Sequence, residues 1–178
     1  MNLTIYTVGH STRTIENFIA LLKAYGIETI VDVRKIPKSR HNPQYSQDAL
    51  ISSLAEHNIS YLRLEGLGGR RTTNKESINK AWENLSFRGY ADYMQTAEFV
   101  DSLNQLIHIA AEKQTVIMCA EAVPWRCHRS LIADALVIRN IAVQDIISEK
   151  SCKPHKLTSF AQVNGNTITY PANEKERI

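Results

Sequence analysis

The residues best suited to chemistry gather in one short segment of the chain. They are Cys119, Glu121, Arg126, Cys127, His128 and Arg129. A cysteine thiolate is a good nucleophile, and nearby arginines lower a thiol pKa. The Glu121 carboxylate opposes thiolate formation, but it can serve as a general base or as a partner for an arginine. We therefore predict that Cys119 and Glu121 are catalytic; the alternative for Cys119 is a buried structural cysteine.

The pattern on either side predicts how this segment is held. An apolar, β-favouring run at 116–118 precedes it, and apolar residues at helical spacing follow it from Leu131 to Ile138. This order of strand, polar loop and helix is typical of an open α/β sheet, where ligands bind beyond the carboxyl ends of the strands. Helix N-termini there also offer free amide donors to anions.

The rest of the chain repeats that alternation. Further strands are expected at 3–8, 29–33, 59–64 and 143–147, with helices between most of them. One helix is expected to begin at the N-cap Thr14 and to end before Gly26, and another is expected at 90–94. The sequence therefore predicts an α/β fold with a mostly parallel sheet of about five strands and helices on both faces. Asn164-Gly165 predicts a C-terminal β-hairpin. We expect a single domain over residues 1–178, with 171–178 a loose tail.

Several polar residues fall just after predicted strand ends, which share one edge in a parallel sheet. The residues expected to bind substrate there are His10, Ser11, Arg34, Arg40, Arg70, Arg71, Arg126 and Arg129. The Gly68-Gly69 pair before two of them suits an anion cradle of backbone amides and guanidinium groups; a mobile surface turn is the alternative.

Positive charge is concentrated in one region. Residues 34–71 hold seven Lys or Arg against three Asp or Glu, whereas the whole chain has a net charge of only +3. This distribution favours an anionic small molecule or a nucleic acid as partner, the alternative being a solvated basic surface. Phe87-Arg88-Gly89-Tyr90 with Tyr93 also combines a cation with aromatic rings, as base stacking requires, although ordinary helix packing explains it equally well.

Cysteine usage and hydropathy bear on compartment and cofactors. Three cysteines do not make a disulfide framework, and no run is long and apolar enough for a signal peptide or a membrane span. We expect a cytoplasmic protein with no membrane partner. Cys119, Cys127 and His128 are an alternative metal site, but zinc sites usually show two spaced ligand pairs, so we predict no metal and no cofactor. The oligomeric state is left open.

Several short motifs are spread along the chain. They are Tyr6-Thr7-Val8-Gly9-His10-Ser11, Val31-Asp32-Val33-Arg34, Leu67-Gly68-Gly69-Arg70-Arg71, Phe87-Arg88-Gly89-Tyr90-Ala91-Asp92-Tyr93, Met118-Cys119-Ala120-Glu121 with Cys127-His128-Arg129, and Pro154-His155-Lys156-Leu157-Thr158. Together these motifs resemble a bacterial family, domain of unknown function 488. The resemblance implies an intracellular α/β domain.

The chain also resembles rhodanese-type domains, more loosely. Ile30-Val31-Asp32-Val33-Arg34 is similar to their early strand, and the strand, cysteine, loop and helix around Cys119 look like their active-site segment. This likeness implies that Cys119 is a nucleophile and that Arg126, with loop amides, binds an anion. The loop is longer than theirs, lacks glycine, and contains Glu121, Pro124 and Trp125.

These observations lead to one functional expectation and two rivals. We expect an enzyme acting on an anionic substrate, either a phosphorylated small molecule or a nucleic-acid component, in an arginine-rich pocket. The first rival is a non-catalytic nucleic-acid-binding module, in which the same arginines only contact phosphates. The second is a metal-binding domain built on Cys119, Cys127 and His128.

Overall fold

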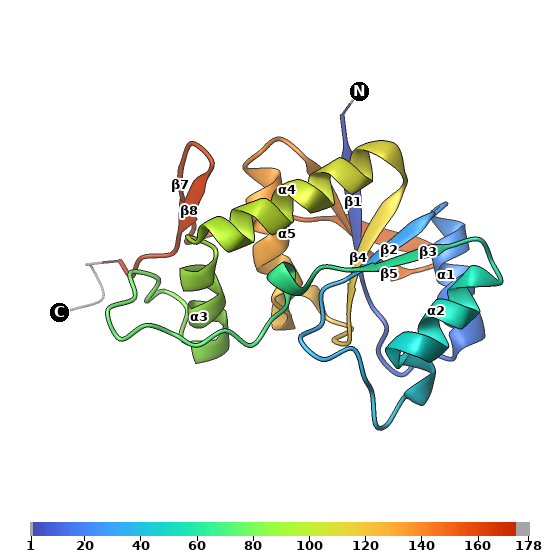
Figure 1. Ribbon diagram of the computed structural model, residues 1–178. Helices are drawn as coiled ribbons and strands as arrows, with labels where there is room; N and C mark the ends of the chain where they lie inside the picture. The colour runs from blue at the N-terminus through green and yellow to red at the C-terminus, as the bar shows by residue number, and fades with distance from the viewer. Residues whose placement is uncertain (1, 174–178) are drawn as a thin grey trace.

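The β-favouring segments form a six-stranded sheet in the computed structural model, which describes residues 2–173 (Figure 1). The strand order is β3-β2-β4-β1-β5-β6, and the first five strands of that order run parallel. The strands are β1 (Thr4–Gly9), β2 (Thr29–Asp32), β3 (Ser60–Arg63), β4 (Thr115–Cys119), β5 (Ala142–Ser148) and β6 (Ser151–Pro154). The predicted α/β class and mostly parallel sheet are confirmed.

The sequence did not predict β6, which pairs antiparallel with β5 at the edge of the sheet. Its residues are exposed or half-buried, and it ends at Pro154. An edge strand of this kind carries no buried apolar alternation, so the signal on which strand prediction depends is missing.

Helices cover both faces of the sheet (Figure 1). They are α1 (Ile15–Ala24), α2 (Gln47–Ala55), α3 (Leu85–Tyr93), α4 (Ala97–Glu112) and α5 (Arg129–Val137). Two predicted helix ends are confirmed: the Thr14 hydroxyl accepts a hydrogen bond from the Asn17 amide at the start of α1, and Gly26 follows its end at φ +62°. Helix α3 begins five residues earlier than expected, because Asn84 caps it by accepting from the Ser86 and Phe87 amides.

Strand β4 lies at the centre and separates two apolar cores. Val116 and Met118 pack with α1 and α2, whereas Ile117 and Cys119 pack with α3, α4 and α5. Both faces of β4 are therefore buried, as expected for an inner parallel strand. Alternation along β4 consequently directs Cys119 toward the face that α5 covers.

The predicted C-terminal hairpin is confirmed as β7 (Gln162–Asn164) and β8 (Thr167–Thr169), with Gly165 at φ +60° in its turn. Tyr170, just after β8, is fully buried and donates a hydrogen bond to the Asp134 carboxylate on α5. The part of the expected loose tail at 174–178 lies outside the described residues.

His155, in the motif after β6, joins two elements of the fold. Its Nε2 lies 2.7 Å from a carboxylate oxygen of Asp134 on α5, and its Nδ1 lies 3.7 Å from Asp145 on β5. Burial lowers the pKa of His155, but the two carboxylates outweigh burial and raise it to about 9. His155 is therefore a cation at neutral pH that ties α5 to the sheet.

No helix within residues 2–173 has both the length and the apolar character needed to cross a bilayer.

Candidate functional site

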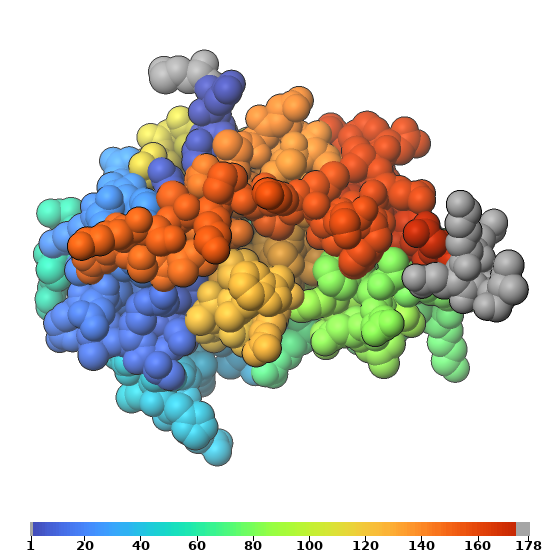
Figure 2. Space-filling view, turned by 180° about the vertical axis from the view of Figure 1, so that it is seen from behind, coloured from blue at the N-terminus to red at the C-terminus, as the bar shows by residue number. Residues whose placement is uncertain are grey.

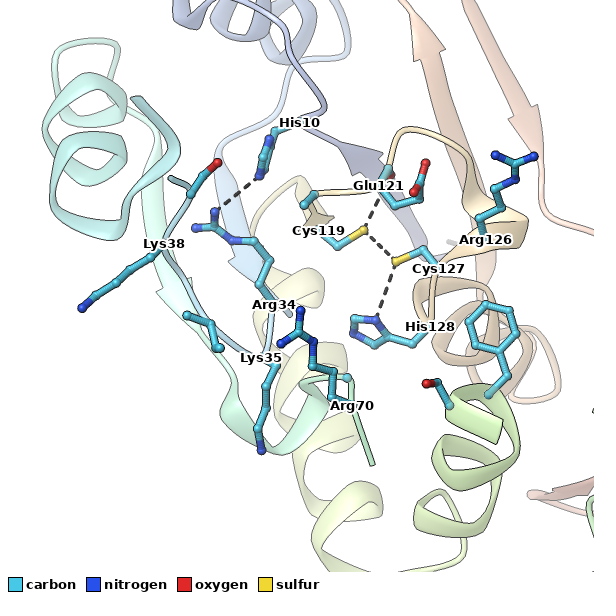
Figure 3. A pocket seen from close by; sticks show the side chains of 16 residues that line it. His10, Arg34, Lys35, Lys38, Arg70, Cys119, Glu121, Arg126, Cys127 and His128 are labelled. Atoms are coloured by element: carbon cyan, nitrogen blue, oxygen red, sulfur yellow. Dashed lines mark hydrogen bonds between the residues drawn. The ribbon is translucent and has the colours of Figure 1, made fainter. Parts of the chain in front are cut away.

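A cavity of about 500 Å³ opens beyond the carboxyl ends of β1, β2 and β4 (Figure 3). This is the edge at which the sequence predicted a site. Its lining comes from chain segments that are far apart in sequence. The lining residues are His10, Arg34, Lys35, Ile36, Lys38, Ser39, Gly69, Arg70, Ser86, Phe87, Cys119, Ala120, Glu121, Arg126, Cys127 and His128.

Cys119, the last residue of β4, places its thiol at the inner end of this cavity. Its Sγ lies 2.7 Å from Sγ of Cys127 and 2.8 Å from Nη1 of Arg129. Burial raises the pKa of the Cys119 thiol, but the hydrogen bond from Cys127 and the Arg129 guanidinium outweigh burial and lower it to about 7. The surroundings of Cys119 thus favour its thiolate form.

Cys127 and His128 continue a line of contacts from that thiol (Figure 3). Burial raises the pKa of Cys127, and its hydrogen bond to Cys119 raises it further, so this sulfur keeps its proton. Sγ of Cys127 lies 3.6 Å from Nδ1 of His128, whose Nε2 lies 2.8 Å from the Val33 carbonyl oxygen. Since a carbonyl only accepts, Nε2 carries the ring proton and Nδ1 is an acceptor. Burial lowers the pKa of His128 to about 4, which keeps the ring neutral.

Arg129 supports the thiol from the protein side rather than from the cavity. Its side chain is almost fully buried at the start of α5. Besides contacting Cys119, the guanidinium donates to the backbone carbonyl oxygens of Glu121, at 2.6 Å, and Ala122, at 3.3 Å. One cation thus stabilises the thiolate and fixes the path of the chain that follows β4.

The β4–α5 loop, residues 120–128, can pass this close to β1 because of Gly9. A Cβ atom on Gly9 would lie 1.8 Å from the Glu121 carbonyl oxygen and 2.8 Å from Cα of Ala122. Gly69 has a similar role on the opposite wall, where a Cβ atom would meet the His128 ring at 2.9 Å. Both glycines are therefore needed for close approach of a neighbour rather than for a positive φ.

The outer part of the same loop is exposed. It contains a short 3₁₀ helix, η3 (Pro124–Arg126), and Trp125 has 71% of its surface accessible. Figure 2 shows the segment around residues 120–130, in golden yellow, at the surface between N-terminal elements in blue and the green region that includes α3. Arg126 lines the cavity that holds the thiols, whereas Trp125 lines a second cavity of about 530 Å³.

Arg34 is fixed before any ligand arrives. Its guanidinium donates to both carboxylate oxygens of Asp32, at 2.7–3.1 Å, and to the Tyr45 carbonyl oxygen at 2.8 Å. Nη1 also lies 3.4 Å from Nε2 of His10, whose ring stacks on Tyr45. Burial lowers the pKa of His10 to about 4, so its ring is neutral beside the guanidinium. Because Asp32 balances its charge, Arg34 adds less positive field to the cavity than an unpaired arginine would.

The more accessible cations are Lys35, Lys38, Arg70 and Arg126, all of which are exposed. Figure 3 shows Arg70 directed toward Arg34, whereas the ends of Lys35, Lys38 and Arg126 point outward, away from the two sulfurs. Long exposed side chains change rotamer readily, so these groups can turn toward an anion at the opening. Arg70 itself sits at φ +56°, a left-handed backbone conformation.

Comparison with protein-family models places these features in a family. The model of "Domain of unknown function DUF488" matches residues 14–136, which is more than half of the chain. The chain belongs to this family. The matched region includes Arg34, Arg70 and the whole β4–α5 loop, while His10 precedes it. Comparison with curated proteins and with solved structures gave no match.

The DUF488 cavity brings together six of the residues that the sequence proposed. His10, Arg34, Arg70, Cys119, Glu121 and Arg126 all line it.

The other four predicted residues lie elsewhere. Ser11 is half-buried beside His10, and Arg40 is exposed outside the lining. Arg71 lies over the Tyr93 ring at 3.8 Å and donates to backbone carbonyl oxygens of Gly68 and Glu65. Arg129 is the buried support described above. A position just after a strand end therefore does not by itself predict whether a residue lines the cavity.

Several lining residues were not among the proposed site residues. They are Lys35, Ile36, Lys38, Ser39 and Ser86. The basic run that follows β2 was a usable signal for the lysines, since it continues past the strand end at the correct edge. Ser86 gave no such signal, because its position depends on where α3 begins.

Cys119, Cys127 and His128 do not form a metal-binding group of the kind proposed as the alternative. Across residues 2–173, no three His, Cys, Asp or Glu side chains form a group that could hold a metal ion.

Proposed function

We propose that this DUF488 protein is an enzyme whose Cys119 thiolate attacks a phosphorylated substrate, either a small molecule or a nucleic-acid component. The observation that carries the proposal is the position of the thiol. Cys119 lines a cavity whose described lining has more basic than acidic side chains, while the buried Arg129 contacts its Sγ. A nucleophile stabilised as its anion, next to groups that attract an anion, is the arrangement that covalent catalysis requires.

The basic side chains divide into two groups with different uses. Arg70, Lys35, Lys38 and Arg126 are exposed at the opening, so they can attract a phosphate and bind its oxygens. Arg34 is held by Asp32, so it presents its remaining donor capacity in a fixed orientation. The likeness to rhodanese-type domains supports the same assignment by analogy, since it gives Cys119 the nucleophile position.

The reaction has two steps in this proposal. In the first, the Cys119 thiolate forms a bond to phosphorus, the bond from phosphorus to the leaving oxygen breaks, and that oxygen takes a proton from water. In the second, water attacks the phosphorus of the thiophosphoryl enzyme and the sulfur leaves as thiolate. Glu121, whose side chain is exposed in the lining, accepts the proton of the attacking water.

The proposal is tested with p-nitrophenyl phosphate and bis(p-nitrophenyl) phosphate, which represent phosphate monoesters and diesters. We expect p-nitrophenol release by the wild type, and a loss of at least about a hundredfold in kcat for Cys119→Ser. Glu121→Gln should keep a first-turnover burst while its steady-state rate falls about tenfold or more. Cys152→Ser, which changes an exposed cysteine outside the cavity lining, is the matched control and should behave as wild type.

Two results would count against this function. Turnover that survives Cys119→Ser would remove the nucleophile from the mechanism. Absence of turnover on both esters, with salt-sensitive binding of a fluorescent single-stranded oligodeoxynucleotide that Cys119→Ser leaves unchanged, would favour the non-catalytic nucleic-acid-binding module.

A further inference from the structure

The second cysteine of the site forms and breaks no bond in the function proposed above, where it only donates a hydrogen bond to the Cys119 thiolate. Cys127 comes from the β4–α5 loop, immediately before His128 and α5, yet its sulfur contacts that of Cys119 at 2.7 Å. Both side chains are nearly buried, with 3% and 6% of their surfaces accessible, and both line the cavity. Two thiols that touch at the end of an open cavity are placed for chemistry with each other.

Little movement separates this contact from a covalent bond. A disulfide has an S–S length of about 2.05 Å, so the sulfurs need to approach by less than about 1 Å. The loop between them closes only a short stretch of chain, and its residues 121 and 122 are held by Arg129. The fold therefore already places the two sulfurs side by side.

The two sulfurs differ in the protonation state that their surroundings favour. Arg129 and the hydrogen bond from Cys127 favour the anion of Cys119, whereas burial and the hydrogen bond to Cys119 raise the pKa of Cys127 and favour its thiol form. Nδ1 of His128, which faces Cys127 at 3.6 Å, is an acceptor because Nε2–H donates to Val33. A proton leaving Cys127 thus has an adjacent base.

From this geometry we propose that the site reacts with a hydroperoxide and that Cys119 and Cys127 then close to a disulfide. In the first step the Cys119 thiolate attacks the terminal peroxide oxygen, the O–O bond breaks, and Cys119 becomes a sulfenic acid while the other oxygen leaves as an alcohol or water after taking a proton from solvent water. In the second step the Cys127 sulfur attacks the Cys119 sulfur and displaces hydroxide. The proton of Cys127 passes through His128 to that hydroxide, which leaves as water.

Overall, two thiols are oxidised to one disulfide and one hydroperoxide is reduced, so the electrons balance. A dithiol reductant such as dithiothreitol reverses the reaction by thiol–disulfide exchange. The disulfide removes the nucleophile on which the proposed phosphate chemistry depends. The oxidation can be tested without the natural phosphate substrate, so its result does not depend on whether the proposed phosphate chemistry is correct.

The test treats the reduced full-length protein with hydrogen peroxide, blocks remaining thiols under denaturing conditions, and measures intact and peptide masses. We expect the loss of two hydrogens, a peptide cross-linked between Cys119 and Cys127, and recovery of both thiols with dithiothreitol. Cys127→Ser should stop at a Cys119 sulfenic acid that dimedone labels, whereas Cys119→Ser should yield no Cys127 adduct. Cys152→Ser should give the same cross-link as wild type, since Cys152 is exposed and separate from the pair.

Two results would contradict the proposed role of Cys127. If Cys119 and Cys127 both remain free while Cys152 oxidises, or if Cys119 passes to sulfinic acid in the wild type as readily as in Cys127→Ser, then Cys127 is not a resolving thiol. A near-wild-type thermal unfolding temperature for Cys127→Ser separates lost chemistry from lost folding. If that variant is unfolded, the cross-linked peptide in Cys152→Ser alone decides the question.

Discussion

Arg129 contacts the Cys119 sulfur from within the protein: its Nη1 lies 2.8 Å from Sγ although only 1% of the arginine surface is accessible. Water screens the charge of a buried guanidinium only weakly, so this charge acts strongly on the neighbouring thiol. The same group holds the carbonyl oxygens of residues 121 and 122. Arg129 therefore acts on both the charge state of the thiol, together with the hydrogen bond from Cys127, and the shape of the β4–α5 loop.

Replacing this arginine should make Cys119 less reactive at neutral pH. Arg129→Met removes the cation, so the pKa of Cys119 should rise by about one unit or more, and Arg129→Lys should have a smaller effect. The rate of iodoacetamide alkylation of Cys119 against pH, followed by peptide mass spectrometry, measures the shift. The exposed Cys152 in the same molecule is an internal reference whose profile should not change. Identical Cys119 profiles in all three proteins would show that Arg129 does not control the thiol.

The exposed arginines of the cavity should determine its affinity for phosphate. Arg70→Ala and Arg126→Ala should each weaken binding of inorganic phosphate by a few-fold to about tenfold, as expected for the loss of one charge-assisted contact. Isothermal titration calorimetry at low ionic strength measures the dissociation constant for phosphate in each variant. Arg40→Ala is the matched control, because Arg40 comes from the same basic region but lies outside the lining. An equal loss for all three variants would indicate a diffuse basic surface without a site.

The His155 contacts predict how stability depends on pH. The pKa of His155 is about 9 in the folded protein against an ordinary value of 6.5, so its contribution to stability is complete below about pH 6.5 and is lost as pH rises through 9. Urea unfolding between pH 6 and about 9.5 should show this decline. His155→Gln should flatten the decline, and it should destabilise the protein by about 1–3 kcal/mol at pH 6, since Asp134 and Asp145 lose their cation.

His57→Gln is the control for that experiment, because His57 is exposed near the end of α2. It should leave the pH dependence as in the wild type. An equally steep decline in His155→Gln would show that the histidine does not link α5 to the sheet.

The close approach of the β4–α5 loop to β1 makes Gly9 difficult to replace. In Gly9→Ala the added methyl group meets backbone atoms of residues 121 and 122, which cannot rotate away, so we expect a loss of about 3 kcal/mol or more. Gly165→Ala is a useful comparison: nothing lies within 4 Å of its added Cβ, and only the positive φ is penalised, by about 1–2 kcal/mol. Urea unfolding of both variants compares them. A smaller loss for Gly9→Ala than for Gly165→Ala would contradict this packing.

Local sequence patterns were sufficient for most of the framework. The apolar alternation of β1, the continuous apolar run of β4 and the cap at Thr14 depend on neighbours within a few residues, so the sequence reveals them without a tertiary structure. They also indicated the edge of the sheet at which the cavity lies, since the carboxyl ends of parallel strands share one edge. The sequence patterns did not predict β6, because this strand buries almost no apolar surface. They also placed the start of α3 too late, because the only signal for it is one capping asparagine, Asn84.

What each polar residue does at that edge was decided only by packing. Arg126 and Arg129 are three positions apart, yet one is exposed at the cavity and the other is buried against the thiol, because Arg129 lies within the inward turn of α5. The contact of Cys119 with Cys127 likewise depends on how a loop folds back over β1, which Gly9 permits. Sequence determined which residues follow the strands of this protein, while the tertiary structure determined where their side chains point, because burial and hydrogen bonding with distant segments select each rotamer.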